Sequence, residues 1–257
     1  MVEEYVLHHK RRLHIIPLGD LHVGARNCNY DYIEYAIRTI KNLNGPKRVY
    51  MMGDLLETAD KRVGGSVFEQ DMSLDDQVCF IRDLLEPISD DIVFFCRGNH
   101  EDRLIRMYDL DLTRLLAEDF EKPYGYQCHD EFIVNGRPFK VMAYHGKGSS
   151  RSPYLAYGKL VRELGNFKAD LYLYGHLHMT GAYREFYWSP EGVSQRVYVL
   201  SGHFMKYWSG YAEAGALTYS PEGFGICSLN KDCFISYNPF HIHERRPDLL
   251  VCGDGVG

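Results

Sequence analysis

Five apolar runs in the chain end in the same way, with a glycine or small residue followed by Asp, Asn or His. The runs end in IIPLGDLH, VYMMGDLLE, FFCRGNHE, KVMAYHG and YLYGHLH. Such runs are typical of buried strands, and core strands that repeatedly end in polar side chains need a chemical reason. The polar residues at the five ends are Asp20, His22, Asp54, Asn99, His100, His145, His176 and His178.

Carboxylates, imidazoles and an amide oxygen gathered at one place form the donor set of a divalent metal site. In an open α/β sheet the carboxyl ends of neighbouring strands share one crevice, so we expect these strand ends to converge. Without metals, so many partly buried polar groups would be costly. Mixed oxygen and nitrogen ligation without thiolates suits Mn, Fe, Zn or Ni better than Ca or Mg. Residues two apart on an extended segment point the same way, so Asp20 and His22 could share a metal.

The ordered set resembles the calcineurin-like metallophosphoesterase superfamily. That pattern is DxH, GD, GNH with an acidic residue, a lone His, and GHxH, and here it runs from Asp20 to His178. The resemblance implies an α/β fold of two packed mixed β-sheets flanked by helices, with a dinuclear metal centre. It also implies that a hydroxide activated by two metals attacks a phosphoester.

The resemblance carries over residue by residue. One metal would take Asp20, His22 and His178, and the other would take Asn99, His145 and His176. The Asp54 carboxylate would bridge the two metals, and His100 would be the catalytic histidine near the leaving group. Manganese is the expected ion of the pair, with Fe, Zn and Ni as alternatives. Glu101 is expected to play a structural part at the start of a helix.

The spacing of apolar residues predicts the elements that position these ends. In the first half, strands at 12–19, 47–53 and 91–96 alternate with helices at 30–45, 74–88 and 101–120. That alternation predicts right-handed βαβ units and a largely parallel sheet. In the second half we expect a hairpin at 130–144 around Asn135-Gly136, a helix at 152–167, and strands at 170–175, 181–188, 194–202, 223–229 and 233–240. No linker or repeat divides the chain, so residues 1–257 are expected to form one domain.

Composition limits the setting in which the protein works. The seven cysteines are scattered and form no close pair, and no apolar run is long enough to span a bilayer. With no secretory signal in the first residues, we expect a cytoplasmic protein without a membrane partner. The net charge of −6 weighs mildly against a long nucleic acid as an obligatory partner.

Three functions remain open at this point. The first is hydrolysis of a phosphoester, with a phosphodiester or nucleotide-type substrate favoured. The second is a nuclease resembling repair-complex metallophosphoesterases, acting on DNA, with single-stranded nucleic acid as the partner. The third, a non-catalytic protein-binding scaffold, is disfavoured because every expected position is filled. The GDLLE and GNHEDR segments depart from the longer signatures of the Ser/Thr protein phosphatase branch. This departure disfavours a phosphoprotein phosphatase.

Several further residues are candidates for substrate contact. Arg26, Arg103 and Arg151 could meet a phosphate, and His203 ends another predicted strand at the edge of the site. The aromatic-rich segment 203–222 could cover a substrate, form an interface or simply pack. The sequence predicts neither the oligomeric state nor the physiological substrate.

Overall fold

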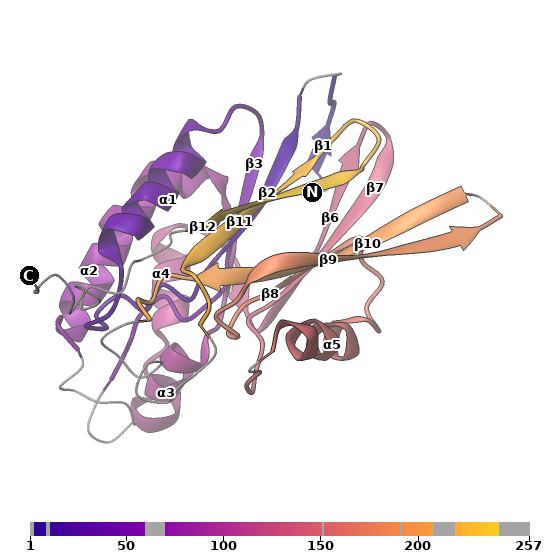
Figure 1. The fold of residues 1–257 in the computed structure, drawn as a ribbon. Coiled ribbons are helices and arrows are strands. Elements are labelled where there is room, and N and C mark those ends of the chain that lie inside the picture. The colour runs from indigo at the N-terminus through magenta and orange to yellow at the C-terminus, as the bar shows by residue number, and fades with distance from the viewer. Residues whose placement is uncertain are drawn as a thin grey trace, which may run out of the picture.

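The structure is a computed structural model that describes residues 3–8, 11–59, 70–150, 152–190, 192–207 and 219–241. Within these ranges its strands form two halves, each covered on its outer face by helices (Figure 1). Arg151, most of the aromatic-rich segment 203–222 and part of the segment 58–73 lie outside the described residues.

The first half of the sheet is built from the N-terminal βαβ units and two late strands. Its parallel strands are β2 (Leu13–Leu18), β3 (Lys47–Met51), β4 (Ile92–Cys96) and β5 (Tyr124–Gly125). On the other side of β2 lie the antiparallel strands β11 (Gly223–Leu229) and β12 (Ile235–His241). The predicted parallel sheet in the first part of the chain is confirmed.

The second half of the sheet is mixed. It contains β1 (Glu3–Tyr5), β6 (Gln127–Val134), β7 (Arg137–Tyr144), β8 (Leu171–Tyr174), β9 (Thr180–Ser189) and β10 (Gly192–His203). The β6–β7 hairpin turns at Asn135 and Gly136, as the Asn-Gly pair predicts. β8 runs parallel to both β7 and β10. Strand pairing joins the two halves at one short antiparallel contact in the described residues, where Gly202 pairs with Phe224 and His203 with Gly223.

Alternation along the strands divides the apolar side chains between an inner and an outer core. In β2, Leu13 and Ile15 face the other half of the sheet, whereas Ile16 and Leu18 face the helices. The same alternation separates Leu171 and Leu173 from Tyr172 and Tyr174 in β8. Period-two burial on both faces is what a strand shows when it is sandwiched between two layers. The predicted architecture of two packed mixed sheets flanked by helices is therefore confirmed.

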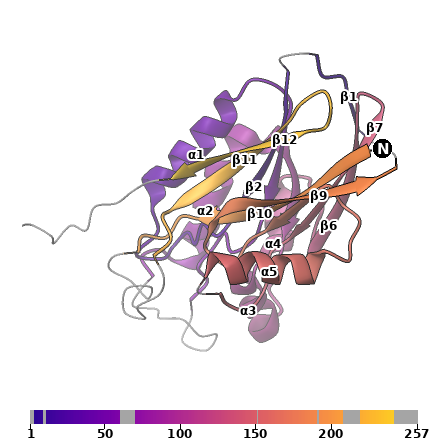
Figure 2. The same cartoon turned by 45° about the vertical axis from the view of Figure 1, so that its right-hand side comes forward.

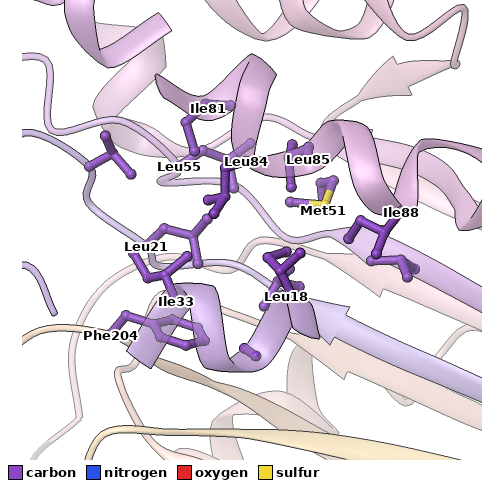
Figure 3. Close-up of a cluster of buried hydrophobic side chains, with 14 of the residues drawn as sticks. Leu18, Leu21, Ile33, Met51, Leu55, Ile81, Leu84, Leu85, Ile88 and Phe204 are labelled. Atoms are coloured by element: carbon purple, nitrogen blue, oxygen red, sulfur yellow. The ribbon is translucent and has the colours of Figure 1, made fainter. Parts of the chain in front are cut away.

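The helices cover the outer faces. On the first half lie α1 (Tyr30–Asn42), α2 (Leu74–Leu85), the 3₁₀ helix η2 (Glu86–Asp91), α3 (Asn99–Tyr108) and α4 (Leu112–Asp119). Figure 3 shows Ile33 of α1 and Leu84 of α2 among the side chains that pack with Leu18 and Met51. α5 (Pro153–Leu164) covers the second half, and it stays on the opposite side from α1 and α2 when the molecule is turned (Figure 2).

The helix predicted at 101–120 is wrong as a single element. Two helices, α3 and α4, occupy this region, and Asp109 between them has a left-handed backbone with φ of 54°. Asp111 then caps α4, because its side chain accepts a hydrogen bond from the backbone N–H of Arg114 at 3.0 Å. No helix in the described part of the chain is long and apolar enough to cross a membrane.

Candidate metal centre

The eight predicted site residues follow the ends of β2, β3, β4, β7 and β8, and two of them, Asn99 and His100, are the first residues of α3. Five of them have left-handed backbone, which L-residues seldom adopt. They are Asp20 (φ 50°), His22 (φ 50°), Asp54 (φ 49°), His176 (φ 65°) and His178 (φ 51°). Backbone of this kind persists where the surrounding structure imposes it, and it clusters at functional sites.

Two glycines allow the loops after β3 and β4 to touch. A Cβ placed on Gly98 would lie 2.1 Å from the backbone nitrogen of Asp54, and one on Gly53 would lie 2.7 Å from the nitrogen of Gly98. Neither distance is compatible with a side chain. The glycines therefore bring Asp54 and the start of α3 into direct backbone contact, which places Asn99 and His100 next to the carboxylate.

The first group of converging ligands is Asp20, His22 and His178. The Nε2 atoms of His22 and His178 face each other at 3.1 Å, and the Nε2 of His178 lies 3.4 Å from Oδ1 of Asp20. Asp20 is fully buried and accepts hydrogen bonds from the backbone N–H of His176. Ligand atoms from these three residues all lie within 4.8 Å of one another.

The second group is Asp54, His145 and His176, with Asn99 beside it. The Nε2 of His145 lies 3.3 Å from Oδ2 of Asp54 and 3.1 Å from Oδ1 of Asn99. A third group, formed by His22, Asp54 and His100, overlaps with both others. Asp54 thus lies where the two outer groups meet, and the structure brings all eight predicted residues together in one cluster.

Hydrogen bonds to the imidazoles decide which nitrogen each ring presents. In His145 the Nδ1 donates to the carbonyl of Met52 at 2.6 Å, and in His176 the Nε2 donates to the carbonyl of Gly148 at 2.6 Å. A carbonyl only accepts, so the opposite nitrogen of each ring keeps its lone pair. A histidine anchored in this way is oriented as a metal ligand.

The donor set fits divalent metals. The lone pairs of buried imidazoles and the carboxylates of Asp20 and Asp54 point at common positions, and a cation there would satisfy both. His22 also donates from Nδ1 to the Glu57 carboxylate at 3.0 Å, which leaves its Nε2 lone pair facing the Nε2 of His178. Carboxylate and imidazole ligation without thiolate suits transition metals.

The comparisons with known proteins agree with this cluster. The sequence profile of the calcineurin-like phosphoesterase family matches residues 13–180, which include all eight residues. The chain belongs to the calcineurin-like phosphoesterase family. The family and the His/Asp clusters together indicate a metal-dependent phosphoesterase with a divalent-metal site.

Solved structures with similar folds are distant in sequence. A predicted phosphoesterase from Streptococcus pneumoniae TIGR4 is 15% identical with a TM-score of 0.38, over 91% of this chain and 100% of that one. Zinc-bound wild-type Vps29 from Entamoeba histolytica is 12% identical with a TM-score of 0.41, over 89% of this chain and 98% of that one. No curated protein sequence matches the chain.

Glu57 is a site residue of this phosphoesterase that the sequence interpretation missed. Its Oε2 accepts the Nδ1–H of His22 at 3.0 Å and lies 3.4 Å from Nδ1 of His100, which also donates to the Glu57 carbonyl at 2.9 Å. The carboxylate therefore connects a metal-ligand candidate with the catalytic candidate. The only sequence signal was an acidic residue three positions after Asp54.

Glu101 has the structural role that the sequence predicts, although by a different contact. Its carboxylate accepts hydrogen bonds from the backbone N–H groups of Asp54 at 3.2 Å, Leu55 at 2.7 Å and Leu56 at 3.1 Å. Burial and the nearby charge of Asp54 raise the pKa of Glu101 to about 7. The carboxylate thus fixes the loop that carries Asp54.

Electrostatics separates the histidines into two kinds. Burial opposes protonation of His145, yet the Asp54 carboxylate outweighs it and raises the pKa of His145 to about 10. Burial likewise opposes protonation of His22, but its bond to Glu57 and the charge of Asp54 raise that pKa to about 9. Burial and the positive charge of His22 lower the pKa of His100 to about 4. His100 is thus the neutral imidazole, whereas the carboxylates around His22 and His145 favour a positive charge at those two rings, which a bound cation would supply in place of a proton.

The remaining candidates for substrate contact differ in whether they reach the site. Arg103 reaches the site, and its Nη2 lies 3.0 Å from Nε2 of His100. Arg26 is exposed, and Arg151 lies outside the described residues. His203 is buried and stacks on His178 with ring centroids 5.3 Å apart, while its Nε2 donates to the carbonyl of Ser220 at 3.3 Å. His203 therefore borders the centre by contact with His178 and belongs to none of the metal-ligand groups found among the described residues.

Proposed function

We propose that the protein is a dinuclear metal-dependent hydrolase of phosphoesters, with a phosphodiester of nucleotide type as the favoured substrate. The observation that carries the proposal is the position of Asp54, whose carboxylate belongs to the group of His145 and His176 and also to the middle group, which shares His22 with the first. Asp20, His22 and His178 would hold one divalent ion, and Asn99, His145 and His176 the other. Manganese suits this donor set.

Bound in this way, two divalent ions would supply an activated water and would balance the charge of the phosphoryl group. The protein's own residues would supply the rest. Asp54 lies 1% exposed between the two groups, so its charge acts on both through little water. The left-handed backbone in the loops after β2, β3 and β8 holds the candidate ligands in place before substrate arrives.

His100 is the proposed proton donor to the leaving oxygen. Its Nδ1 donates to the carbonyl of Glu57, so its Nε2 faces the centre, 4.0 Å from Oδ2 of Asp54. The neutral ring carries its proton on Nδ1, so His100 would first take up a second proton at this Nε2 and then give it to the leaving oxygen. The Glu57 carboxylate, 3.4 Å from Nδ1, would stabilise the imidazolium before transfer.

The test is hydrolysis of bis-p-nitrophenyl phosphate and p-nitrophenyl phosphate, measured side by side with added Mn²⁺. We expect turnover that depends on metal, with the diester hydrolysed faster. A preference for the monoester would reject the diester assignment and direct the search to nucleotides and other monoesters. If metal-loaded protein hydrolysed neither ester, the proposed hydrolase activity would be contradicted and a binding scaffold would be favoured.

A further inference from the structure

Arg103 is placed one helical turn after His100, on the same face of α3. Its Nη2 donates a hydrogen bond to Nε2 of His100 at 3.0 Å, because a guanidinium has donors only. This is the very nitrogen that the proposed function directs at the leaving group. Arg103 therefore already occupies the space beside the reacting bond.

Arg103 forms no direct ion pair among the described residues, although its charge helps to lower the pKa of Glu57. No carboxylate in this part of the chain lies within 4.0 Å of its guanidinium, and its Nη1 is enclosed with no hydrogen-bond partner. Its helix neighbour Arg106 differs, because it is exposed and its guanidinium pairs with Asp102. An enclosed cationic donor without an acceptor is costly, so the site retains a guanidinium N–H group that lacks a hydrogen-bond partner.

We propose that Arg103 binds a non-bridging oxygen of the phosphoryl group, a contact that rests on the proposed phosphoesterase function. The planar fork of a guanidinium matches the spacing of phosphate oxygens and forms strong, charge-assisted hydrogen bonds. A bound phosphoryl group supplies the acceptor that Nη1 lacks. It also draws Nη2 away from His100, which frees Nε2 to face the leaving oxygen.

The contact makes Arg103 a residue that distinguishes substrates by charge. A phosphomonoester carries a second negative charge that a diester does not, so a fixed guanidinium stabilises the bound monoester more. Loss of Arg103 is then expected to raise the KM of the monoester by a larger factor than the KM of the diester.

The experiment compares Arg103→Ala and Arg103→Lys with Arg106→Ala, which removes an arginine of the same helix outside the site. Binding of inorganic phosphate to the manganese-loaded proteins is measured by titration calorimetry, and KM and kcat are measured for both nitrophenyl esters. We expect Arg103→Ala to weaken phosphate binding by about tenfold or more. Arg103→Lys should recover part of this loss, and Arg106→Ala should leave phosphate affinity unchanged.

Metal content and Tm of each variant establish that it is folded and loaded. Phosphate affinity that stays at the wild-type value in folded Arg103→Ala would overturn the proposal. A fall in kcat with unchanged phosphate affinity would also overturn it, since Arg103 would then act only by positioning His100. The calorimetry needs no turnover, so phosphate binding still decides the role of Arg103 if the wild type hydrolyses neither ester.

Discussion

The two halves of the proposed metal centre are held by different means. The ligands that follow β2 and β3 depend on carboxylate side chains, because Glu57 orients His22 and Glu101 fixes the loop of Asp54. In the second half, His145 and His176 depend on backbone, because they are anchored by the carbonyls of Met52 and Gly148. One substitution can remove a carboxylate, whereas a carbonyl anchor survives any side-chain change.

This difference indicates where the centre is most easily disturbed. Glu57 contacts His22 of the first half, whereas Asp54 belongs to the group of His145 and His176 and also to the middle group that shares His22 with the first half. The His145 anchor adds a further link, since the carbonyl of Met52 at the end of β3 ties a ligand of the second half to the first. The two halves are therefore unequally sensitive to side-chain substitution, although the contact of His145 with Met52 connects them.

The largest effect is expected from Asp54→Asn, which tests whether the halves share one ligand. Loss of the carboxylate removes the charge that attracts a cation to either group, so metal retained after dialysis should fall from about two ions to one or fewer. Elemental analysis by mass spectrometry measures this. Asp119→Asn, which changes an exposed carboxylate paired with Arg82, is the control and should retain its metal. Full retention of two ions in Asp54→Asn would contradict the bridge.

The next effect separates ligation from chemistry. His100→Ala should keep its metal, because its proposed task is proton transfer, yet its kcat should fall by roughly 10²- to 10⁴-fold. The fall should be smaller for an ester whose leaving group needs no proton. His129→Ala, at an exposed histidine that packs on Phe167, should leave kcat unchanged. Unchanged turnover in His100→Ala would mean that the proton donor is misassigned.

Glu57→Gln tests the side-chain anchor of the first half. The amide keeps the size of the side chain but loses the charge that holds His22, so affinity for one of the two ions should fall by about 10- to 100-fold. The second ion should bind as before, since His145 and His176 keep their backbone anchors. Competition with a chelator measures the two affinities separately. An equal loss of both ions would show that the halves are not independently held.

The strand ends could be read from the sequence because each one combines an apolar run with a polar break. Asp20, Asn99 and His145 needed no knowledge of tertiary contacts. The alternation of strands and helices predicted the parallel part of the sheet, and the family resemblance implied the two packed sheets flanked by helices. The contact of Glu57 with two histidines could not be read in this way. It arises only when the loop after β3 folds back over the start of α3.

Two other features depend on tertiary structure in the same sense. The break between α3 and α4 depends on one residue, Asp109, taking a left-handed conformation that apolar spacing does not reveal. The stacking of His203 on His178 depends on the short pairing of β10 with β11 that joins the halves of the sheet. Sequence periodicity describes single elements, so contacts between loops of distant elements escape it.

The smallest effect concerns a histidine outside the centre. His14 in β2 donates from Nε2 to the carbonyl of Asn44 at 3.1 Å and contacts the Ser228 hydroxyl through Nδ1 at 2.8 Å. Burial lowers its pKa, and the charges of Lys47 and Arg12 act in the same direction. The unfolded chain therefore takes up this proton at higher pH than the folded chain does. The stability that His14 contributes is complete above the unfolded pKa of about 6.5 and is lost as pH falls through the folded value.

His14→Gln removes this titration and retains a hydrogen-bonding side chain of similar length. The free energy of unfolding in urea should then decline less between pH 7.5 and pH 5.5 in the variant than in the wild type. The same difference should appear in metal-free protein and in protein loaded with Mn²⁺, because His14 contacts Ser228 and Asn44 rather than the ligands of the centre. Equal declines in variant and wild type would mean that the protonation of His14 is not linked to folding. A difference that vanished on metal loading would mean that His14 is coupled to the metal centre through β2.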